Sequence, residues 1–200
     1  MRIKTANVLF AAAVLATPVQ AQAPDRSRPP DLGPAPSLNL PEIQRFELSN
    51  GLRVMLMEKH NVPLVQVDLV VHSGTVDDPR GKTGLASLTA AMMDEGAGDR
   101  DALELADAIE FLGADILVGA GLHVSWVDLH TPLAQLEPAL ELYADVILRP
   151  TFAAEELDRQ RRNRLTSIMQ WHDEARVIAS QMFNRVLFGD DHPYGVPGFG

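Results

Sequence analysis

Apolar and polar positions alternate through residues 43–59, and this alternation predicts a β-hairpin. The two alternating runs flank Asn50-Gly51, a pair that a tight type I′ turn favours. Later apolar runs of similar length are bounded by turn residues, which is the pattern of further strands. These strands are expected at about residues 64–72, 115–119 and 123–130.

A helical spacing of apolar positions appears between and after these strands. The pattern predicts helices at about residues 84–94, 101–113, 133–149, 155–171 and 174–188. Because hairpins and helices come in separate runs, the order predicts an α+β domain in which an antiparallel sheet packs against helices.

Two of the expected helices begin with a recognisable signal. Asp101 and Glu104 have the spacing of a capping box. Thr131-Pro132 is expected to cap the later helix, which Pro150 ends. The expected core faces are Ala102, Leu105, Ile109 and Leu112 in the first helix, and Leu133, Leu136, Leu140, Ala144 and Ile147 in the second.

Residues 1–21 have the pattern of a secretory signal peptide, with cleavage expected near Ala21. Arg2 and Lys4 precede an apolar run that is too short to span a membrane. Residues 22–41 contain six prolines and predict an extended linker, so the domain is expected at 42–200. The expected localisation is periplasmic, and no later segment is long and apolar enough to span a bilayer.

The charge and the cysteine content exclude several classes of function. The formal net charge is −10, and it becomes −12 without residues 1–21, which hold two of the 17 basic residues and none of the 27 acidic ones. Nucleic acid and anionic lipid repel such a chain. The absence of cysteine excludes disulfides, thiolate metal sites and a thiol nucleophile.

Residues 81–98, "GKTGLASLTAAMMDEGAG", raise two alternatives for chemistry. Gly81-Lys82-Thr83 before a helix resembles the end of a phosphate-binding loop, but Val76 stands where that loop needs its first glycine. Two aspartates nearby would also repel phosphate. An ordinary loop is therefore the favoured interpretation.

The helix that follows this loop is expected to have two unlike faces. One face carries an apolar stripe that should face the core, formed by Leu85, Leu88 and Met92. The opposite face is small and flat. It contains Ser87, Ala90, Ala91 and Asp94.

From about residue 43 to its end, the chain resembles the N-terminal half of the insulinase/pitrilysin-type zinc peptidases, the inverzincins. The resemblance is carried by the order and spacing of "SNGLRV", "VVHSGTVDDPRGKTGLASLTAAMMDEGAG", "ELADAIEFLGADI", "PALELYADVILRPTFAAEELDRQR" and "HPYG". It implies an α+β metallopeptidase-like fold, and a second similar domain beyond this sequence.

In active members of that family, this helix carries H-x-x-E-H, whose histidines bind zinc and whose glutamate is the general base. A later helix supplies a further glutamate as the third ligand. The resemblance places these four positions on Ser87, Ala91, Ala90 and Ser167, respectively. None of the four side chains can act as its family counterpart does. We therefore expect no catalytic residue, no metal ligand and no cofactor in this chain.

Neighbouring charges are given ordinary roles. Asp94 and Glu95 lie at a helix end, where acidic side chains are usually solvated. The crowded arginines of the helix at 155–171 are interpreted as a solvated face in preference to a substrate clamp.

The resemblance implies a non-catalytic subunit of an exported heterodimeric zinc metalloendopeptidase. Zinc is then expected only in a catalytic H-x-x-E-H partner, whose peptide-binding chamber this chain completes, and peptides are the expected substrates. An Arg/Tyr pair of the missing half is expected to contribute to substrate contact. The main alternative is a stand-alone periplasmic module that binds peptides or proteins. An enzyme with unconventional ligands is disfavoured.

Overall fold

The computed structural model describes residue 33 and residues 41–199. The expected signal peptide lies outside the described residues, as does nearly all of the expected linker. The chain divides between Glu58 and Lys59 into two compact units. Within the described part, no helix is long and apolar enough to cross a membrane.

The first unit contains the predicted hairpin, formed by β1 (Ile43–Glu47) and β2 (Arg53–Met57). The expected type I′ turn is wrong. Gly51 has a φ of 87°, but Asn50 keeps a negative φ and accepts a hydrogen bond from Leu52 N through its side chain at 3.1 Å. A type I′ turn needs positive φ at both central residues, so the strands are joined by a longer loop that Leu48 and Leu52 close.

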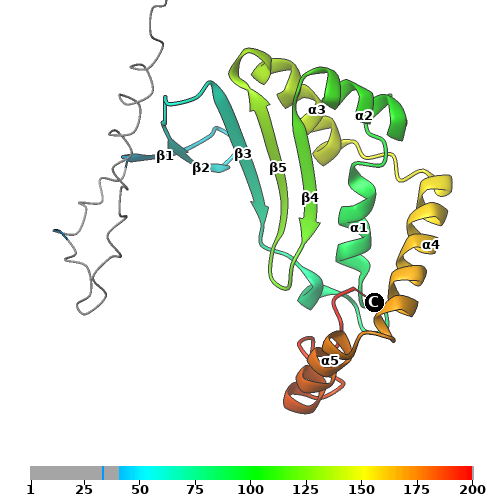
Figure 1. Cartoon of the computed structure of the whole chain (residues 1–200). Helices are drawn as coiled ribbons and strands as arrows, with labels where there is room; N and C mark the ends of the chain where they lie inside the picture. The colour runs from blue at the N-terminus through cyan, green and yellow to red at the C-terminus, as the bar shows by residue number, and fades with distance from the viewer. Residues whose placement is uncertain (1–32, 34–40, 200) are drawn as a thin grey trace, which may run out of the picture. The chain divides into compact units, whose positions relative to one another are not determined.

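The second unit has a three-stranded antiparallel sheet in the order β3-β5-β4 (Figure 1). Its strands are β3 (Leu64–Val71), β4 (Asp115–Ala120) and β5 (Ser125–Pro132). The α-helices of this unit are α1 (Leu85–Met93), α2 (Ala102–Phe111), α3 (Leu136–Leu148), α4 (Ala154–Trp171) and α5 (Ala175–Phe188). This arrangement confirms the predicted α+β class with an antiparallel sheet.

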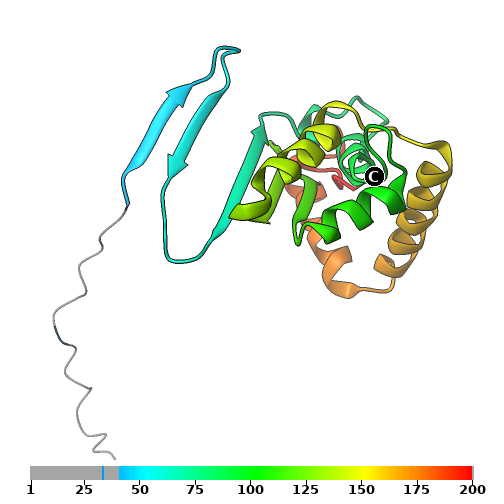
Figure 2. The same ribbon diagram turned by 90° about the horizontal axis from the view of Figure 1, so that it is seen from above.

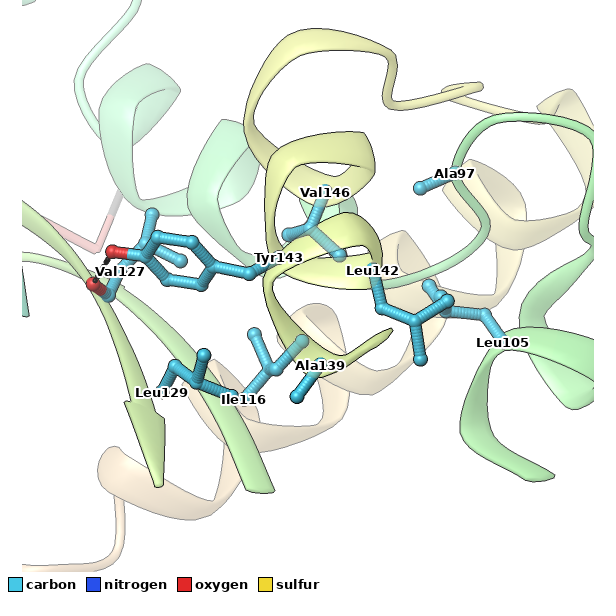
Figure 3. Packing of buried hydrophobic residues seen from close by; sticks show 9 residues of the cluster. All are labelled: Ala97, Leu105, Ile116, Val127, Leu129, Ala139, Leu142, Tyr143 and Val146. Carbon is cyan, nitrogen blue, oxygen red and sulfur yellow. Dashed lines mark hydrogen bonds between the residues drawn. The ribbon is translucent and has the colours of Figure 1, made fainter. Parts of the chain in front are cut away.

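The core lies between one face of the sheet and helices α2 and α3. Val127 and Leu129 of the central strand are both buried and sit two residues apart, so they point to the same face. Leu129 pairs with Val67 on one side and with Ile116 on the other, which continues the apolar face across the sheet. Leu105 of α2 and four residues of α3 cover this face, together with Ala97 of the loop between α1 and α2 (Figure 3). The four residues of α3 are Ala139, Leu142, Tyr143 and Val146.

Helix α2 begins as predicted. Asp101 accepts a hydrogen bond from Glu104 N at 2.9 Å, and Asp101 N donates to the Glu104 carboxylate at 3.1 Å. This reciprocal pair satisfies backbone donors that the first helical turn leaves open. It also sets the phase of the helix, and Leu105 is fully buried as expected.

The expected core face of α3 is wrong except at Ile147, which is half-buried and packs against the core. Leu133 is 56% exposed and Leu140 is 37% exposed. Thr131 and Pro132 end strand β5 instead of capping the helix, and a 3-10 turn (Leu133–Gln135) comes before α3. The delayed start lets a different stripe, with spacings of three and four residues, face the sheet. That stripe is Ala139, Leu142, Tyr143 and Val146.

Tyr143 fixes which stripe is buried. Its ring lies in the core, and its hydroxyl donates a 2.7 Å hydrogen bond to the Val127 carbonyl (Figure 3). A buried tyrosine hydroxyl needs such an acceptor, because an unpaired polar group in an apolar interior is costly. This hydrogen bond therefore favours the observed orientation of α3.

Replacing Tyr143 by Phe should lower the free energy of unfolding by about 0.5–1.5 kcal/mol, because the buried hydrogen bond is lost. Urea denaturation followed by circular dichroism measures the change. The matched control is Tyr194→Phe, where the hydroxyl makes an exposed contact with His123 Nε2. It should change stability by less than about 0.5 kcal/mol. Equal losses in the two variants would contradict a special role for Tyr143.

The stability of the protein should also depend on Tyr143 at high pH. Burial raises the pKa of Tyr143 to about 12, whereas a tyrosine in an unfolded chain has a pKa of about 10. The folded pKa is the higher one, so this contribution is complete below pH ~10 and is lost as the pH rises toward the folded value. Between about pH 9 and about pH 11, wild type should lose more stability than Tyr143→Phe. Parallel losses would show that Tyr143 does not titrate in this way.

Candidate functional site

Helix α1 lies between strand β4 and helix α4 (Figures 1 and 2). Gly84, with a φ of 89°, turns the chain into the helix. The Asp78 carboxylate accepts hydrogen bonds from Gly84 N at 2.8 Å and Ala86 N at 2.9 Å. In a phosphate-binding loop, backbone amides of this kind donate hydrogen bonds to the phosphate. Here they donate to a side-chain carboxylate instead. This supports the interpretation of residues 81–83 as an ordinary loop.

The expected apolar stripe of α1 is only partly buried. Met92 is 2% exposed and Leu88 is half-buried, but Leu85 is 45% exposed. Ala90, which was expected on the opposite face, is 4% exposed. The prediction of a single core face is therefore wrong. A helix that packs against a strand on one side and a helix on another is buried on more than one face. Small residues such as alanine allow both neighbours to pack closely.

Ser87 is linked to α4 through Arg164. Arg164 Nη1 donates to Ser87 Oγ at 2.9 Å, and the same nitrogen lies 3.1 Å from the Gly84 carbonyl oxygen. The Ser87 hydroxyl in turn donates to the Gly84 carbonyl oxygen at 3.0 Å. The Ser87 hydroxyl therefore donates one hydrogen bond, to Gly84, and accepts one from the Arg164 cation.

Arg164 is half-buried and held from a second side by Phe199. The Phe199 carbonyl oxygen accepts a hydrogen bond from Arg164 Nη1 at 2.9 Å, and the Arg164 guanidinium carbon lies 4.1 Å from the centre of the Phe199 ring. Burial lowers the pKa of Arg164 below its usual value. A guanidinium nevertheless stays charged in proteins, so Arg164 keeps a positive charge beside Ser87.

The other three positions that the resemblance marks show no link of this kind. Ala90 is buried and Ala91 is half-buried on α1. Ser167 is half-buried on α4, and its hydroxyl donates to the Asn163 carbonyl oxygen of its own helix at 3.1 Å. The structure thus brings Ser87 together with α4 through Arg164, one turn before Ser167.

The residues at these positions do not fit a zinc ion. Zinc sites are built from imidazole, carboxylate or thiolate ligands, whereas this helix face offers one neutral hydroxyl and two methyl groups. The nearby guanidinium would also repel a divalent cation. Among residue 33 and residues 41–199, no group of three or more His, Cys, Asp or Glu side chains is placed to hold a metal ion.

Sequence reasoning missed Arg164 because it treated the arginines of α4 as one solvated face. Arg161 and Arg162 are exposed as expected, whereas Arg164 is half-buried. The available signal was its place beside an apolar stripe, since Leu165 and Ile168 follow it by one and four residues.

Glu95 also differs from the expectation of a solvated acid. Only 15% of its side chain is exposed, and it accepts hydrogen bonds from Arg159 and Gln160 of α4. Arg159 is shared with Glu156 at 2.6 Å. These contacts join the end of α1 to the start of α4, so α1 is fastened to α4 near both of its ends.

A family model for insulinase (peptidase family M16) matches residues 53–192. The chain belongs to the insulinase family. Relatives in this family include an uncharacterized zinc protease of Mycobacterium leprae, which is 28% identical over 79% of this chain and 35% of its own length. The beta subunit of the mitochondrial-processing peptidase of Rattus norvegicus is 29% identical over 68% of this chain and 28% of its own length.

Solved structures agree with this membership. The crystal structure of a peptidase M16 inactive domain from Pseudomonas fluorescens matches with a TM-score of 0.76 and 30% identity, over 80% of this chain and 39% of that one. A protease from Helicobacter pylori has the same fold, with a TM-score of 0.72 and 20% identity over 81% of this chain and 39% of its own. The chain thus covers well under half the length of these relatives.

The assignment of the four family positions predicts that a zinc site can be rebuilt. The variant Ser87→His, Ala90→Glu, Ala91→His, Ser167→Glu should bind zinc, because it restores two imidazoles and a distal carboxylate. Adding Arg164→Leu should tighten binding at least about tenfold, because the guanidinium next to position 87 is removed. Isothermal titration calorimetry measures both affinities.

The control for this experiment is the same set of changes without Ser167→Glu, which should bind zinc at least about tenfold more weakly because one ligand is missing. If neither full set takes up zinc while circular dichroism shows that both are folded, the assignment of positions is wrong. If the control binds as tightly as the full set, the error lies at Ser167.

Proposed function

We propose that this protein is a non-catalytic subunit of an exported insulinase-type zinc metalloendopeptidase. In this proposal it completes the peptide-binding chamber of a catalytic partner that carries H-x-x-E-H. The observation that carries the proposal is the surface of α1, where Ser87, Ala90 and Ala91 stand at the positions that the resemblance assigns to the family's zinc ligands and general base. None of these three side chains has the chemistry of a zinc ligand. Arg164 adds a positive charge to that surface.

The chain belongs to the insulinase family, and its side chains at the assigned positions do not fit zinc. Together these two points support the role of a non-catalytic part of a peptidase. The likeness to an M16 domain described as inactive, at 30% identity, points the same way. A second relative is by name one subunit of a processing peptidase. In such an arrangement the family fold supplies a chamber wall, and the chemistry is left to the partner.

The export part of the proposal rests on residues 1–21, with their basic start, apolar run and small residues at Val19-Gln20-Ala21. A periplasmic location follows from it. Zinc belongs to the partner in this proposal, and this chain needs no cofactor of its own.

The test is to measure peptide hydrolysis and zinc content for this protein alone, for a family member with H-x-x-E-H encoded beside it, and for the mixture. This protein alone should neither cut peptides nor retain one zinc per chain. The mixture should cut peptides at least about tenfold faster than the partner alone, because the chamber is then complete. A partner with its H-x-x-E-H glutamate changed to Gln is the control, and it should abolish hydrolysis in the mixture.

Stoichiometric zinc and peptide hydrolysis by this protein alone would overturn the proposal. If the mixture behaves as the partner alone while this protein binds peptides by itself, the stand-alone binding module is the correct function instead.

A further inference from the structure

A cavity of about 290 Å³ lies between the start of α1 and the middle of α4. Its wall is apolar, and the side chains of Leu85, Leu88, Leu165 and Ile168 contribute to it. Two of these leucines are largely exposed, Leu85 at 45% and Leu165 at 51%. Apolar side chains that stay open to solvent around a cavity favour an apolar occupant.

Three basic side chains, Lys82, Arg161 and Arg164, line the same cavity, and no acidic side chain does. None of the three forms an ion pair with another residue of the described part of the chain. Arg159, which lies on the same helix as Arg161 and Arg164, is by contrast paired with two glutamates. In a chain with a net charge of −10, a local group of uncompensated cations favours an anionic ligand.

Arg164 is held in place for such a ligand. Its Nη1 atom is fixed by oxygens of Gly84, Ser87 and Phe199, and its guanidinium carbon lies over the Phe199 ring. Its Nε and Nη2 atoms have no acceptor within the described residues. A guanidinium that is already ordered loses little side-chain entropy when it binds a carboxylate, and its fork of N–H groups matches the two carboxylate oxygens.

We propose that this cavity binds a carboxylate that is carried by an apolar group, and that its natural source is the C-terminal residue of a peptide. Arg164 and Arg161 would receive the carboxylate, and the leucine and isoleucine wall would receive the apolar side chain. The volume is at the small end of ligand pockets, which span about 300–1,000 Å³, so it suits one residue and not a long segment. The carboxylate chemistry stands on the cavity alone, whereas the peptide source rests on the proposed function.

Binding is tested by calorimetry on the protein without a partner, with three probes that share one apolar group. The probes are acetyl-Gly-Gly-Leu with a free carboxylate, the same peptide with a C-terminal amide, and 4-methylpentanoate. The free acid should bind at least tenfold more tightly than the amide. It should also bind at least threefold more tightly than 4-methylpentanoate, which lacks the peptide backbone.

Variants on α4 locate the site. Arg161→Gln removes an exposed cation that lines the cavity and should weaken binding of the free acid at least fivefold. Arg162→Gln is the matched control, because it makes the same change of charge on the same helix at a residue outside the cavity. It should alter binding by less than twofold. Both side chains are exposed, so both variants should fold as wild type does.

Equal binding of the acid and the amide would overturn the proposal, and so would absence of binding by the acid. Equal weakening by Arg161→Gln and Arg162→Gln would also overturn it, because long-range attraction would then explain the binding. If 4-methylpentanoate binds as tightly as the peptide acid, the carboxylate site stands and the peptide source is wrong. None of these outcomes depends on a catalytic partner, so they are separate from a failure of the proposed function.

Discussion

The position of helix α1 between strand β4 and helix α4 is the constraint on which the site depends. A helix with neighbours on two sides can pack closely only where its side chains are small, and this helix has alanines at residues 86, 90 and 91. The small side chains on this helix also limit the chemistry that its surface can perform. At the positions where the resemblance places the family's zinc ligands, this helix carries a hydroxyl and methyl groups. The hydroxyl, that of Ser87, accepts a hydrogen bond from the Arg164 guanidinium.

Arg164 shows how a half-buried cation can hold a fold together without an ion pair. Removing a charge from water is costly unless its hydrogen-bonding groups are satisfied, and Arg164 Nη1 donates to two carbonyl oxygens and the Ser87 hydroxyl. It thereby joins α1, α4 and the segment that contains Phe199. The same arrangement leaves part of the guanidinium facing a cavity whose wall is apolar. A structural cation and a recognition site for an anion are compatible here, because the two uses engage different nitrogen atoms.

Several features could be predicted from the sequence because they depend on neighbours along the chain. The capping box of Asp101 and Glu104, the hairpin strands and the long helix α4 are of this kind, since each is decided within a few residues. Predictions failed where distant parts of the chain compete. The buried face of α3 includes Tyr143, whose hydroxyl donates a hydrogen bond to the Val127 carbonyl of strand β5. Glu95 is covered because Arg159 and Gln160 of α4 donate hydrogen bonds to it.

The sequence by itself determined the α+β class and the resemblance to a peptidase family, because residue types at fixed spacing carry this information. Only the tertiary structure decided that Arg164 stands beside Ser87 and that Lys82 and Arg161 border the same cavity. Ser87 and Arg164 are separated by 77 positions, and Lys82 precedes both cavity arginines by more than that. Charged side chains are solvated unless the fold covers them. A local sequence pattern does not show which basic side chain becomes partly buried when two helices pack together.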